Sequence, residues 1–565
     1  MNVMLRLKKL LIDHVSSLFG VAADRLSHLE FKINNDQGAQ FGDVSCNVAM
    51  LLSKQVGKNP REVATQLQQV LSAPEHASII QSVAIAGPGF LNFTLTTQAW
   101  RTLIQELYTQ KADFFKLGPD DKKYSVDIEF VSANPTGPLH LGHGRGGIIG
   151  DTLARVLNFL GHRASKEFYI NDAGNQIKLL GQSLKARCLQ QFGQAAEIPE
   201  GGYAGDYLVD LAKDCVAQHG PDVKDKSDQF FELYAKEQLL NLIKADLAAY
   251  GITFDTWFSE KTLHDSSAID KTLALLQSKD LVYEKDGALW FRSTSFGDDK
   301  DRVVRKSGGE LTYIAADLAY LRDKFDRGFD RVNYVLGHDH HSYKVRLQAA
   351  MQAFDYDVAN LDVILYQLVN IKMGGEAVKM SKRAGTFTKL SDVVEAVGKD
   401  VARFFYLNRK TDAPLDFDLD VALKKTEENP VYYIQYAYVR INSLLQKAHQ
   451  EGFGAWIDQM KAGKLTDAQF DEMMQHMSAE ETTLFKKVAS LSDIMRSIAT
   501  THQTHMLSYY ALELAQKLHG YYTRNKVIDT TQQALSCMRM FTVFVVHQTL
   551  DVSLDVLGLS KPEKM

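Results

Sequence analysis

Hydrophobic and polar positions alternate near residue 125, where Val126, Ile128 and Phe130 are separated by polar residues. This period of two, carried by branched and aromatic side chains, predicts a β-strand. The polar loop 132–138, which contains two prolines, interrupts the alternation. Apolar residues then recur at helical spacing up to Gly161, which predicts a helix that packs on a sheet and ends at that glycine. The outward face of this helix is expected to carry Asp151, Arg155 and Asn158.

Strand and helix patterns continue to alternate along the chain to about residue 425. Strands are predicted in 167–176, 331–336 and 363–369, and 301–320 is interpreted as a return to the sheet followed by a helix. The polar, helical stretch at about 180–291 is interpreted as an insertion between two halves of the sheet. Such alternation predicts an α/β fold with a doubly wound, parallel, Rossmann-like sheet that binds ligands at the carboxyl ends of its strands.

Both ends of the chain differ from this middle part. Residues 1–115 mix short strands, such as 82–85 and 90–95, with helical segments such as 60–71, which predicts a small α+β domain. Beyond about residue 425 only helical patterns remain, and Pro430 is placed to open the first helix. We therefore predict an accessory domain at 1–115, a central domain at 116–425 and an all-α domain at 426–565.

Composition limits the class of protein further. A chain of 565 residues is too long for one hydrophobic core. We find no run close to the roughly 20 apolar residues that cross a bilayer, so a cytoplasmic protein without membrane contact is expected. The four cysteines show no C-x-x-C spacing, which argues against a zinc knuckle and a disulfide framework. The net charge of −5 confines any contact with RNA to local patches.

The first candidate for chemistry is the pair His140 and His143, which lies where the predicted helix begins. Four glycines surround the pair and are expected to keep that surface bare: Gly142, Gly144, Gly146 and Gly147. A helix N-terminus carries free amide donors and a partial positive charge, so two imidazoles there predict a nucleotide phosphate site. Metal ligation and two structural histidines remain open as alternatives. The run 338–341 also holds three histidines and an aspartate, but neighbouring side chains diverge, so no metal site is predicted.

The second candidate is the sequence K-M-S-K, formed by Lys379, Met380, Ser381 and Lys382 in a glycine-flanked loop. Two ammonium groups suit a leaving pyrophosphate, on whose oxygens negative charge accumulates. A pair of solvated lysines is the alternative for this motif taken alone.

Together the two motifs resemble a known family. A-N-P-T-G-P-L-H-L-G-H, residues 133–143, is similar to the signature of class I aminoacyl-tRNA synthetases, and K-M-S-K is similar to their second motif. The flanking sequence resembles arginyl-tRNA synthetase of the bacterial type, and the resemblance covers essentially the whole chain. In that family the N-terminal domain reaches the outer corner of the tRNA, and the helical domain binds the anticodon.

The resemblance implies roles for individual residues. His140, His143, Lys379 and Lys382 would be catalytic, and these four would bind ATP together with Gly142, Met380 and Ser381. Arginine would be bound by Glu129, Asn134, Tyr313, Asp317 and His340, because a guanidinium is best recognised by carboxylates. Tyr436 and Arg440 would bind tRNA by stacking on unpaired bases, although an aromatic stripe of this kind is more often part of a core.

The implied function is arginine–tRNA ligase, with L-arginine, ATP as its magnesium complex, and tRNA(Arg) as partners. No tightly bound cofactor is expected, and a monomer is expected to be the working unit. Two other functions remain open on the residues alone. A small-substrate nucleotidyltransferase would share the His-x-Gly-His turn but leaves the helical domain unexplained, whereas a non-catalytic RNA-binding relative would not need both phosphate motifs.

Overall fold

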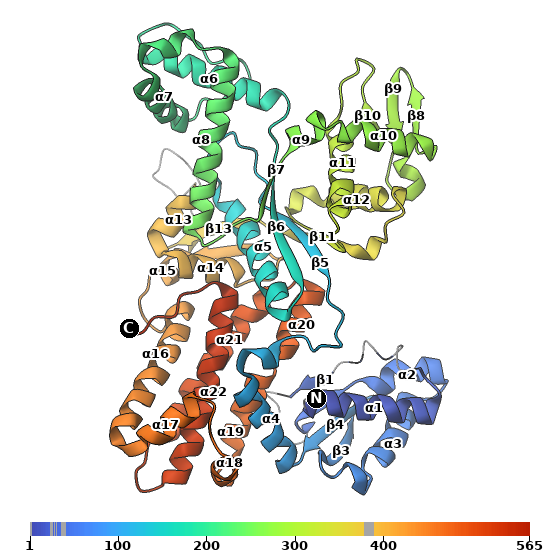
Figure 1. Cartoon of the computed structure of the whole chain (residues 1–565), viewed down its shortest axis with the longest axis vertical. Coiled ribbons are helices and arrows are strands. Elements are labelled where there is room, and N and C mark those ends of the chain that lie inside the picture. Colours follow the sequence, from blue (N-terminus) through green and yellow to red (C-terminus); the bar gives the residue numbers. More distant parts are fainter. Residues whose placement is uncertain (1–2, 23–25, 27–28, 30, 35–40, 378–388) are drawn as a thin grey trace.

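A computed structural model describes residues 3–22, 26, 29, 31–34, 41–377 and 389–565 (Figure 1). Its centre is a five-stranded sheet of order β12-β11-β5-β6-β7 in which all neighbouring strands are parallel. The strands are β5 (Ser125–Phe130), β6 (Arg163–Ile170), β7 (Thr256–Ser259), β11 (Arg331–Gly337) and β12 (Leu361–Tyr366). The predicted parallel sheet is confirmed.

Helix α5 (Leu141–Leu160) connects β5 to its neighbour β6 and packs on the central sheet. Gly161 ends the helix with a left-handed φ of 102°, as its place in the sequence predicts. The predicted outward position of Asp151 is wrong, because this carboxylate is fully buried. Asn158 is exposed. Arg155 is half-buried, and its Nε donates to Asp151 Oδ2 at 2.7 Å.

The stretch predicted as one insertion is divided by β7, which belongs to the central sheet. Before β7, three helices form a separate helical unit at the top of Figure 1. They are α6 (Asn175–Gln191), α7 (Asp206–His219) and α8 (Asp228–Ala249). The prediction of a single insertion between two halves of the sheet is therefore wrong, because β7 returns to the central sheet within that stretch.

A second unit follows β7 and carries a small antiparallel sheet of order β10-β9-β8. Its elements are α9 (Glu260–Asp265), α10 (Ala268–Ser278), β8 (Val282–Lys285), β9 (Ala288–Phe291), β10 (Arg302–Arg305), α11 (Tyr313–Asp326) and, after β11, α12 (His341–Ala353). The strand at the start of 301–320 was predicted to belong to the central sheet. This prediction is wrong, because the strand is β10, which pairs antiparallel with β9 in the small sheet. The helix predicted after that strand is confirmed as α11.

The predicted strand 363–369 is two strands in two different sheets. Its first part belongs to β12, and its last residue begins β13 (Val369–Met373). Strand β13 pairs with β14 (Glu376–Ala377) and, in parallel, with β15 (Leu415–Asp418). Three helices complete this region: α13 (Leu390–Val397), α14 (Lys399–Leu407) and α15 (Leu419–Ala422).

The N-terminal region is α+β, as predicted, with a four-stranded antiparallel sheet of order β1-β2-β4-β3. Its elements are α1 (Val3–Phe19), β1 (Phe31–Ile33), β2 (Val44–Cys46), α2 (Val48–Val56), α3 (Pro60–Leu71), β3 (Ile80–Ala86), β4 (Phe90–Leu95) and α4 (Thr97–Gln110). Gly42 has a φ of 61°, and a Cβ there would lie 2.5 Å from the carbonyl oxygen of Phe93. This glycine therefore has a packing role.

The C-terminal region is entirely helical over 430–557. The helices are α16 (Pro430–Ala448), α17 (Gly454–Lys461), α18 (Asp467–Met474), α19 (Ala479–Ala489), α20 (Leu491–Thr501), α21 (His505–Arg524) and α22 (Gln533–Leu557). Pro430 opens α16, as predicted. By length and composition α22 could span a membrane, contrary to the sequence-based expectation, but 78% of its apolar window is buried inside the structure, as in a core helix.

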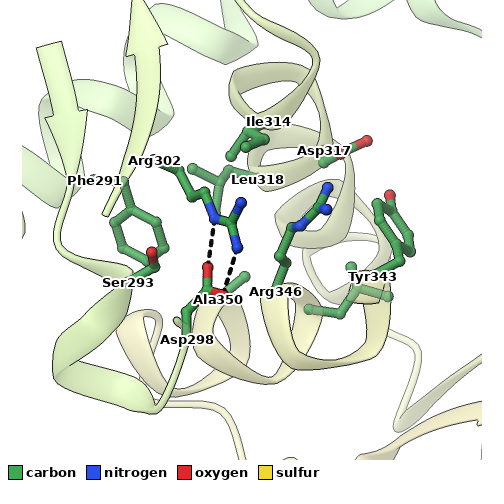
Figure 2. Close-up of a pocket in the computed structure, with 11 residues that line it drawn as sticks. Phe291, Ser293, Asp298, Arg302, Ile314, Asp317, Leu318, Tyr343, Arg346 and Ala350 are labelled. Atoms are coloured by element: carbon green, nitrogen blue, oxygen red, sulfur yellow. Dashed lines mark hydrogen bonds and ion pairs between the residues drawn. The ribbon is translucent and has the colours of Figure 1, made fainter. Parts of the chain in front are cut away.

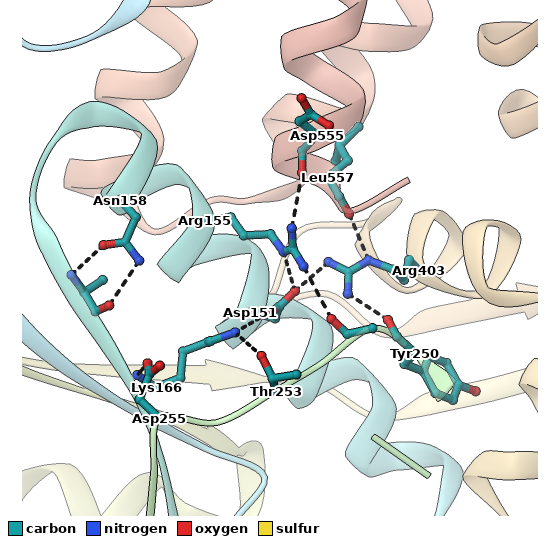
Figure 3. Close-up of polar contacts among 12 residues, drawn as sticks. Asp151, Arg155, Asn158, Lys166, Tyr250, Thr253, Asp255, Arg403, Asp555 and Leu557 are labelled. Atoms are coloured by element: carbon teal, nitrogen blue, oxygen red, sulfur yellow. Dashed lines mark hydrogen bonds and ion pairs between the residues drawn. The ribbon is translucent and has the colours of Figure 1, made fainter. Parts of the chain in front are cut away.

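A buried arginine joins the central sheet to the helical region (Figure 3). Arg403 of α14 donates from Nη2 to Asp151 Oδ2 of α5 at 2.8 Å and from Nη1 to the carbonyl of Tyr250 at 2.9 Å. Its Nε donates to the carbonyl of Leu557, at the end of α22, at 2.9 Å. A Cβ on Gly558 would lie 2.5 Å from the guanidinium, so the chain must carry glycine there for Arg403 to fit.

Candidate active site

We call the first turn of α5 the histidine corner, formed by His140, Gly142 and His143. His140 is the N-cap, and its Nδ1 accepts a hydrogen bond from the amide of Gly142 at 3.1 Å. The Nδ1 of His143 accepts from the amide of His140 at 3.0 Å. Each ring therefore uses its Nδ1 lone pair inward, which assigns the proton of a neutral ring to Nε2.

Burial keeps both imidazoles uncharged at neutral pH. It lowers the pKa of His140 below its usual range, and it lowers the pKa of His143, beside His140, to about 4. The expected pair of imidazole donors is consistent with this geometry, since each neutral ring carries a donor at Nε2. The expectation that the backbone amides are free here is wrong for Gly142 and His140, whose N–H groups bond to the rings.

We expected the glycines of α5 to form one bare surface, and this expectation is wrong. A Cβ on Gly144 would lie 2.6 Å from Leu390, and a Cβ on Gly146 would lie 2.6 Å from the ring of Tyr366. Gly147 is also buried, against Ile252 and Val131. Gly142 is different, because only the ring of His140 lies within 4 Å of such a Cβ. Packing therefore explains three of the glycines, and Gly142 alone keeps the outer surface of the turn open.

The chain that follows the K-M-S-K motif is bonded to the histidine corner. Lys379, Met380, Ser381 and Lys382 lie outside the described residues. The amide of Leu390 donates to the carbonyl of Leu139 at 2.9 Å, and Lys389 forms an isolated β-bridge with His140. The hydroxyl of Tyr250 donates to the carbonyl of Leu390 at 2.8 Å. The described chain therefore resumes beside the histidine corner at Lys389, seven residues after the last lysine of the motif.

We call the second part of the site the carboxylate corner, formed by Glu129, Asp317, Lys324 and Tyr343. Glu129 is buried in β5, where its Oε1 accepts from Ser132 Oγ at 3.0 Å. Asp317 lies on α11, at the same end of a hollow as Tyr343 of α12, whose hydroxyl acts to lower the pKa of this carboxyl. Burial, with the neighbouring charge of Glu129, raises the pKa of Asp317 to about 7. The structure therefore brings two of the predicted arginine ligands into one electrostatic environment.

A hollow of about 330 Å³ lies beside the carboxylate corner (Figure 2). Asp317 and Tyr343 lie at one end, and Arg302, paired with Asp298, lies toward the other. The remaining lining is largely apolar, from residues such as Leu318. Glu129 is not among the lining residues, so the hollow extends behind Asp317 rather than joining the two carboxylates.

The other predicted arginine ligands are solvent-exposed. Tyr313 begins α11 and has 68% of its surface exposed. Asn134 and His340 are exposed on loops that follow the carboxyl ends of β5 and β11. Asn134 and His340 follow strands of the central sheet and Tyr313 begins α11, and no contact joins the three described side chains, so their shared role stays a prediction.

Sequence reasoning missed Lys324 and Tyr343. Lys324 follows Asp317 by seven residues, so it lies on the same face of α11 two turns later. A lysine at that spacing from a candidate ligand, in an otherwise apolar helix face, is the signal that could have found it. Tyr343 offered no such signal, because only the packing of α12 on α11 brings it to Asp317.

The aromatic stripe of α16 is divided between core and surface. Tyr438 is buried, donates to Asp551 at 3.0 Å and stacks on His547. Tyr436 is 47% exposed and stacks on His519 with the ring centroids 5.6 Å apart. The guanidinium of Arg440 lies 3.8 Å from the ring centroid of Tyr522, beside a hollow of about 230 Å³. The two predicted tRNA ligands therefore lie on one aromatic and cationic surface.

Among the described residues, one group is spaced to hold a metal ion: His14, Glu75 and His76. The Nε2 atoms of the two histidines are 2.9 Å apart, which a hydrogen bond between the rings explains. In residues 338–341, where no metal site was predicted, the ring centroids of His338 and His341 lie 6.4 Å apart.

Comparisons with known proteins cover most of the chain. Residues 104–411, more than half of it, match the catalytic domain of class I tRNA synthetases (R). Residues 5–95 match the arginyl-tRNA synthetase N-terminal domain, and 434–565 match the DALR anticodon-binding domain.

Individual relatives give the same result. The chain is 42% identical over 538 residues to an arginine–tRNA ligase of Nitratidesulfovibrio vulgaris, covering 94% of this chain and 95% of the relative. It is 43% identical over 529 residues to that of Solidesulfovibrio magneticus, covering 93% and 94%. The solved arginyl-tRNA synthetase of Thermus thermophilus shares the fold, with a TM-score of 0.73 at 22% identity, over 99% of this chain and 100% of that one.

Proposed function

The chain belongs to the class I arginyl-tRNA synthetases and is an arginine–tRNA ligase, and from this premise we propose how its residues divide the reaction. The carboxylate of arginine attacks the α-phosphate of ATP, which forms arginyl-adenylate and releases pyrophosphate. The arginyl group then passes to the terminal adenosine of tRNA(Arg). The histidine corner serves the phosphates, and the carboxylate corner selects the amino acid.

At the histidine corner, the Nε2–H groups of His140 and His143 donate to phosphate oxygens as negative charge develops on them. Each ring is held by a backbone hydrogen bond at Nδ1, so the donor is oriented before ATP arrives. Such preorganised donors stabilise a transition state without reorganisation. Gly142 leaves room for the adenine side of the nucleotide.

Lys379 and Lys382 hold the β- and γ-phosphate oxygens, with Met380 and Ser381 between them. Support for this proposal comes from the sequence motif and from Lys389, which is bridged to His140. ATP enters as its magnesium complex, in which phosphate oxygens and water supply most of the ligands of the ion.

At the carboxylate corner, Glu129 and Asp317 face the guanidinium of arginine. Arginine can pair with carboxylates through two parallel hydrogen bonds, which gives both affinity and geometric selectivity. Asn134 from the loop after β5, Tyr313 from the start of α11 and His340 from the turn after β11 complete the pocket.

The helical domain binds tRNA(Arg) through Tyr436 and Arg440. A base can stack on an exposed aromatic ring, and the guanidinium adds charge beside the phosphate backbone. We assign the regions 1–115, 116–425 and 426–565 to the outer corner of the tRNA, catalysis and the anticodon, respectively. A monomer in the cytoplasm is the working unit.

The observation that carries this assignment is the pair of carboxylates Glu129 and Asp317, whose charges interact, in the fold that also holds the two histidines at the start of α5. A pyrophosphate-exchange assay tests it, run with arginine and with citrulline, which has the same shape without the positive charge. We expect exchange with arginine only. Equal exchange with both compounds would contradict the role of the carboxylate corner, whichever tRNA the enzyme charges.

A further inference from the structure

Lys324 is a fully buried cation beneath the carboxylate corner. Its side chain has 0% exposure, and its Nζ forms ion pairs with three carboxylates. The partners are Asp127, Glu129 at 3.2 Å and Glu167 at 2.7 Å. Lysine is almost never buried to this degree unless it is paired, so the position has a specific electrostatic cause.

The three carboxylates are not equally satisfied. Glu167 is also bound by Arg327 through two hydrogen bonds of 2.7 and 3.0 Å, and by the hydroxyl of Tyr320 at 2.5 Å. Asp127 Oδ1 and Glu129 Oε2 are buried without a hydrogen-bond partner. Glu167 therefore has a second cation besides Lys324, whereas Lys324 is the cation that is paired with Asp127 and Glu129.

A charge balance follows from these contacts. Four carboxylates pair with two cations, since Arg327 also binds Asp323 at 2.8 Å, so the cluster holds more anions than cations. Glu129 also interacts with Asp317, because its charge helps to raise the pKa of that carboxyl. A cation that arrives at this edge, such as a guanidinium, would balance the excess.

We propose that Lys324 is a positioning residue for arginine recognition, which keeps Glu129 ionised and holds its carboxylate toward the substrate. The inference rests on the proposed place of Glu129 in the arginine pocket. Two contacts hold the carboxylate of Glu129 in place: Lys324 pairs with its Oε2, and Ser132 donates to its Oε1. The remaining lone pairs of both oxygens are left for the two N–H groups of a guanidinium.

The electrostatics of the cluster support this role. Burial raises the pKa of Glu129, and the charge of Lys324 opposes that rise, while Glu167 adds to it. The rings of Tyr320 and Tyr334 cover Lys324, with centroids 4.2 and 5.2 Å from Nζ, and exclude water from it. Without Lys324, the pKa of Glu129 would rise further, so the carboxylate would bind a proton more readily and lose the charge that distinguishes arginine from a neutral analogue.

The test removes Lys324 without leaving an additional unbalanced charge. In the double variant Asp127→Asn/Lys324→Met one anion and one cation disappear, so the buried net charge is unchanged. We expect the arginine KM to rise at least tenfold at pH 7 and the ATP KM to stay within about twofold. The defect should shrink by pH 9, because a higher pH ionises Glu129 again. Asp355→Asn/Lys279→Met, which removes a surface ion pair of 2.6 Å, is the matched control.

Lys324→Arg keeps the charge but moves its position, so the arginine KM should rise by only several-fold, with the pH profile of the wild type. An unchanged arginine KM in the folded double variant would overturn the proposal. Arginine and ATP KM values that rise together, with no dependence on pH, would also overturn it, because that pattern indicates general loss of structure.

A further variant separates this proposal from the pocket assignment. If Glu129→Gln alone leaves the arginine KM unchanged, then the pocket is misplaced, whatever Lys324 does. If the double variant fails to fold, Lys324→Arg is measured in the wild-type and Glu129→Gln backgrounds. A positioning role predicts an effect of several-fold in the wild type that is absent without the Glu129 charge, and equal effects in both backgrounds would overturn it.

Discussion

The two corners of the active site are built in opposite ways. The histidine corner comes from residues 140–143 in one helical turn, uses uncharged rings and takes its hydrogen bonds from its own backbone. The carboxylate corner combines residues from β5, α11 and α12, carries buried charge and is held by side chains distant in the sequence. Neutral donors suit a substrate that brings its own negative charge, whereas buried carboxylates suit one that brings a cation.

This difference has a physical consequence. Neutral rings cost little to bury, so the histidine corner can be local and partly open to solvent. Buried carboxylates are expensive unless cations and hydrogen bonds balance them, and those partners must come from other elements. The arginine site therefore needs a large part of the fold, and it should respond to pH where the histidine corner does not.

The largest effect is expected at the histidine corner. His143→Ala removes an oriented donor, so arginine activation should slow by roughly a hundredfold to a thousandfold, the scale for losing one preorganised donor. The variant also loses the part of the capping box in which the His143 ring accepts from the amide of the N-cap His140, at a cost of no more than about 1 kcal/mol. Pyrophosphate exchange and circular dichroism measure the two effects. His162→Ala is the control, because burial also lowers the pKa of His162 to about 4 but its ring stacks on Tyr124 at the opposite end of the strands.

At the carboxylate corner, Asp317→Asn keeps the shape and removes the charge. Losing a charged hydrogen bond costs about 1.5 to 3 kcal/mol, or more if the cation is left unpaired. The arginine KM should rise about tenfold to a hundredfold, and the ATP KM should change little. Steady-state kinetics with each substrate varied in turn measure this split. An unchanged arginine KM would place the pocket elsewhere.

The two corners should differ in how substrate binding depends on pH. Arginine binds the ionised form of Asp317, whose pKa is raised to about 7, so binding below that pH must displace a proton. The arginine KM should rise by about tenfold per unit as pH falls below 7, and level off above it. The ATP KM should stay nearly flat from pH 6 to 8, because the pKa of His143 is about 4 and its ring stays neutral. The slope for arginine should disappear in Asp317→Asn.

The smallest effect concerns the glycines of α5. Gly146→Ala would place a methyl group 2.6 Å from the ring of Tyr366, and overpacking of this kind costs typically about 1 to 3 kcal/mol. In Gly142→Ala the new methyl group would meet only the ring of His140, at 3.3 Å. The change in stability should be a few tenths of the effect of Gly146→Ala. Thermal unfolding of the two variants provides the comparison. Equal destabilisation would show that the first turn is packed as tightly as the second.

The sequence alone determined the elements with strong periodicity. The parallel strand around Val126, the helix ending at Gly161 and the helix opened by Pro430 all follow from local spacing and local backbone chemistry. The sequence also placed His140 and His143 at a helix start. Backbone hydrogen bonds and helix caps act over a few residues, so the information for them is contained in a short segment.

Tertiary structure decided what lies buried and which residues meet. Asp151 has the helical position of a surface residue, yet it is buried because Arg403 approaches from α14. Strand β10 has a strand pattern, but its partner β9 places it outside the central sheet. Lys324 appears in the sequence as one more lysine, and only the packing of α11 across β5 and β6 surrounds it with carboxylates. Periodicity records which face of an element is apolar, whereas the partner of a buried charge depends on contacts between segments far apart in the chain.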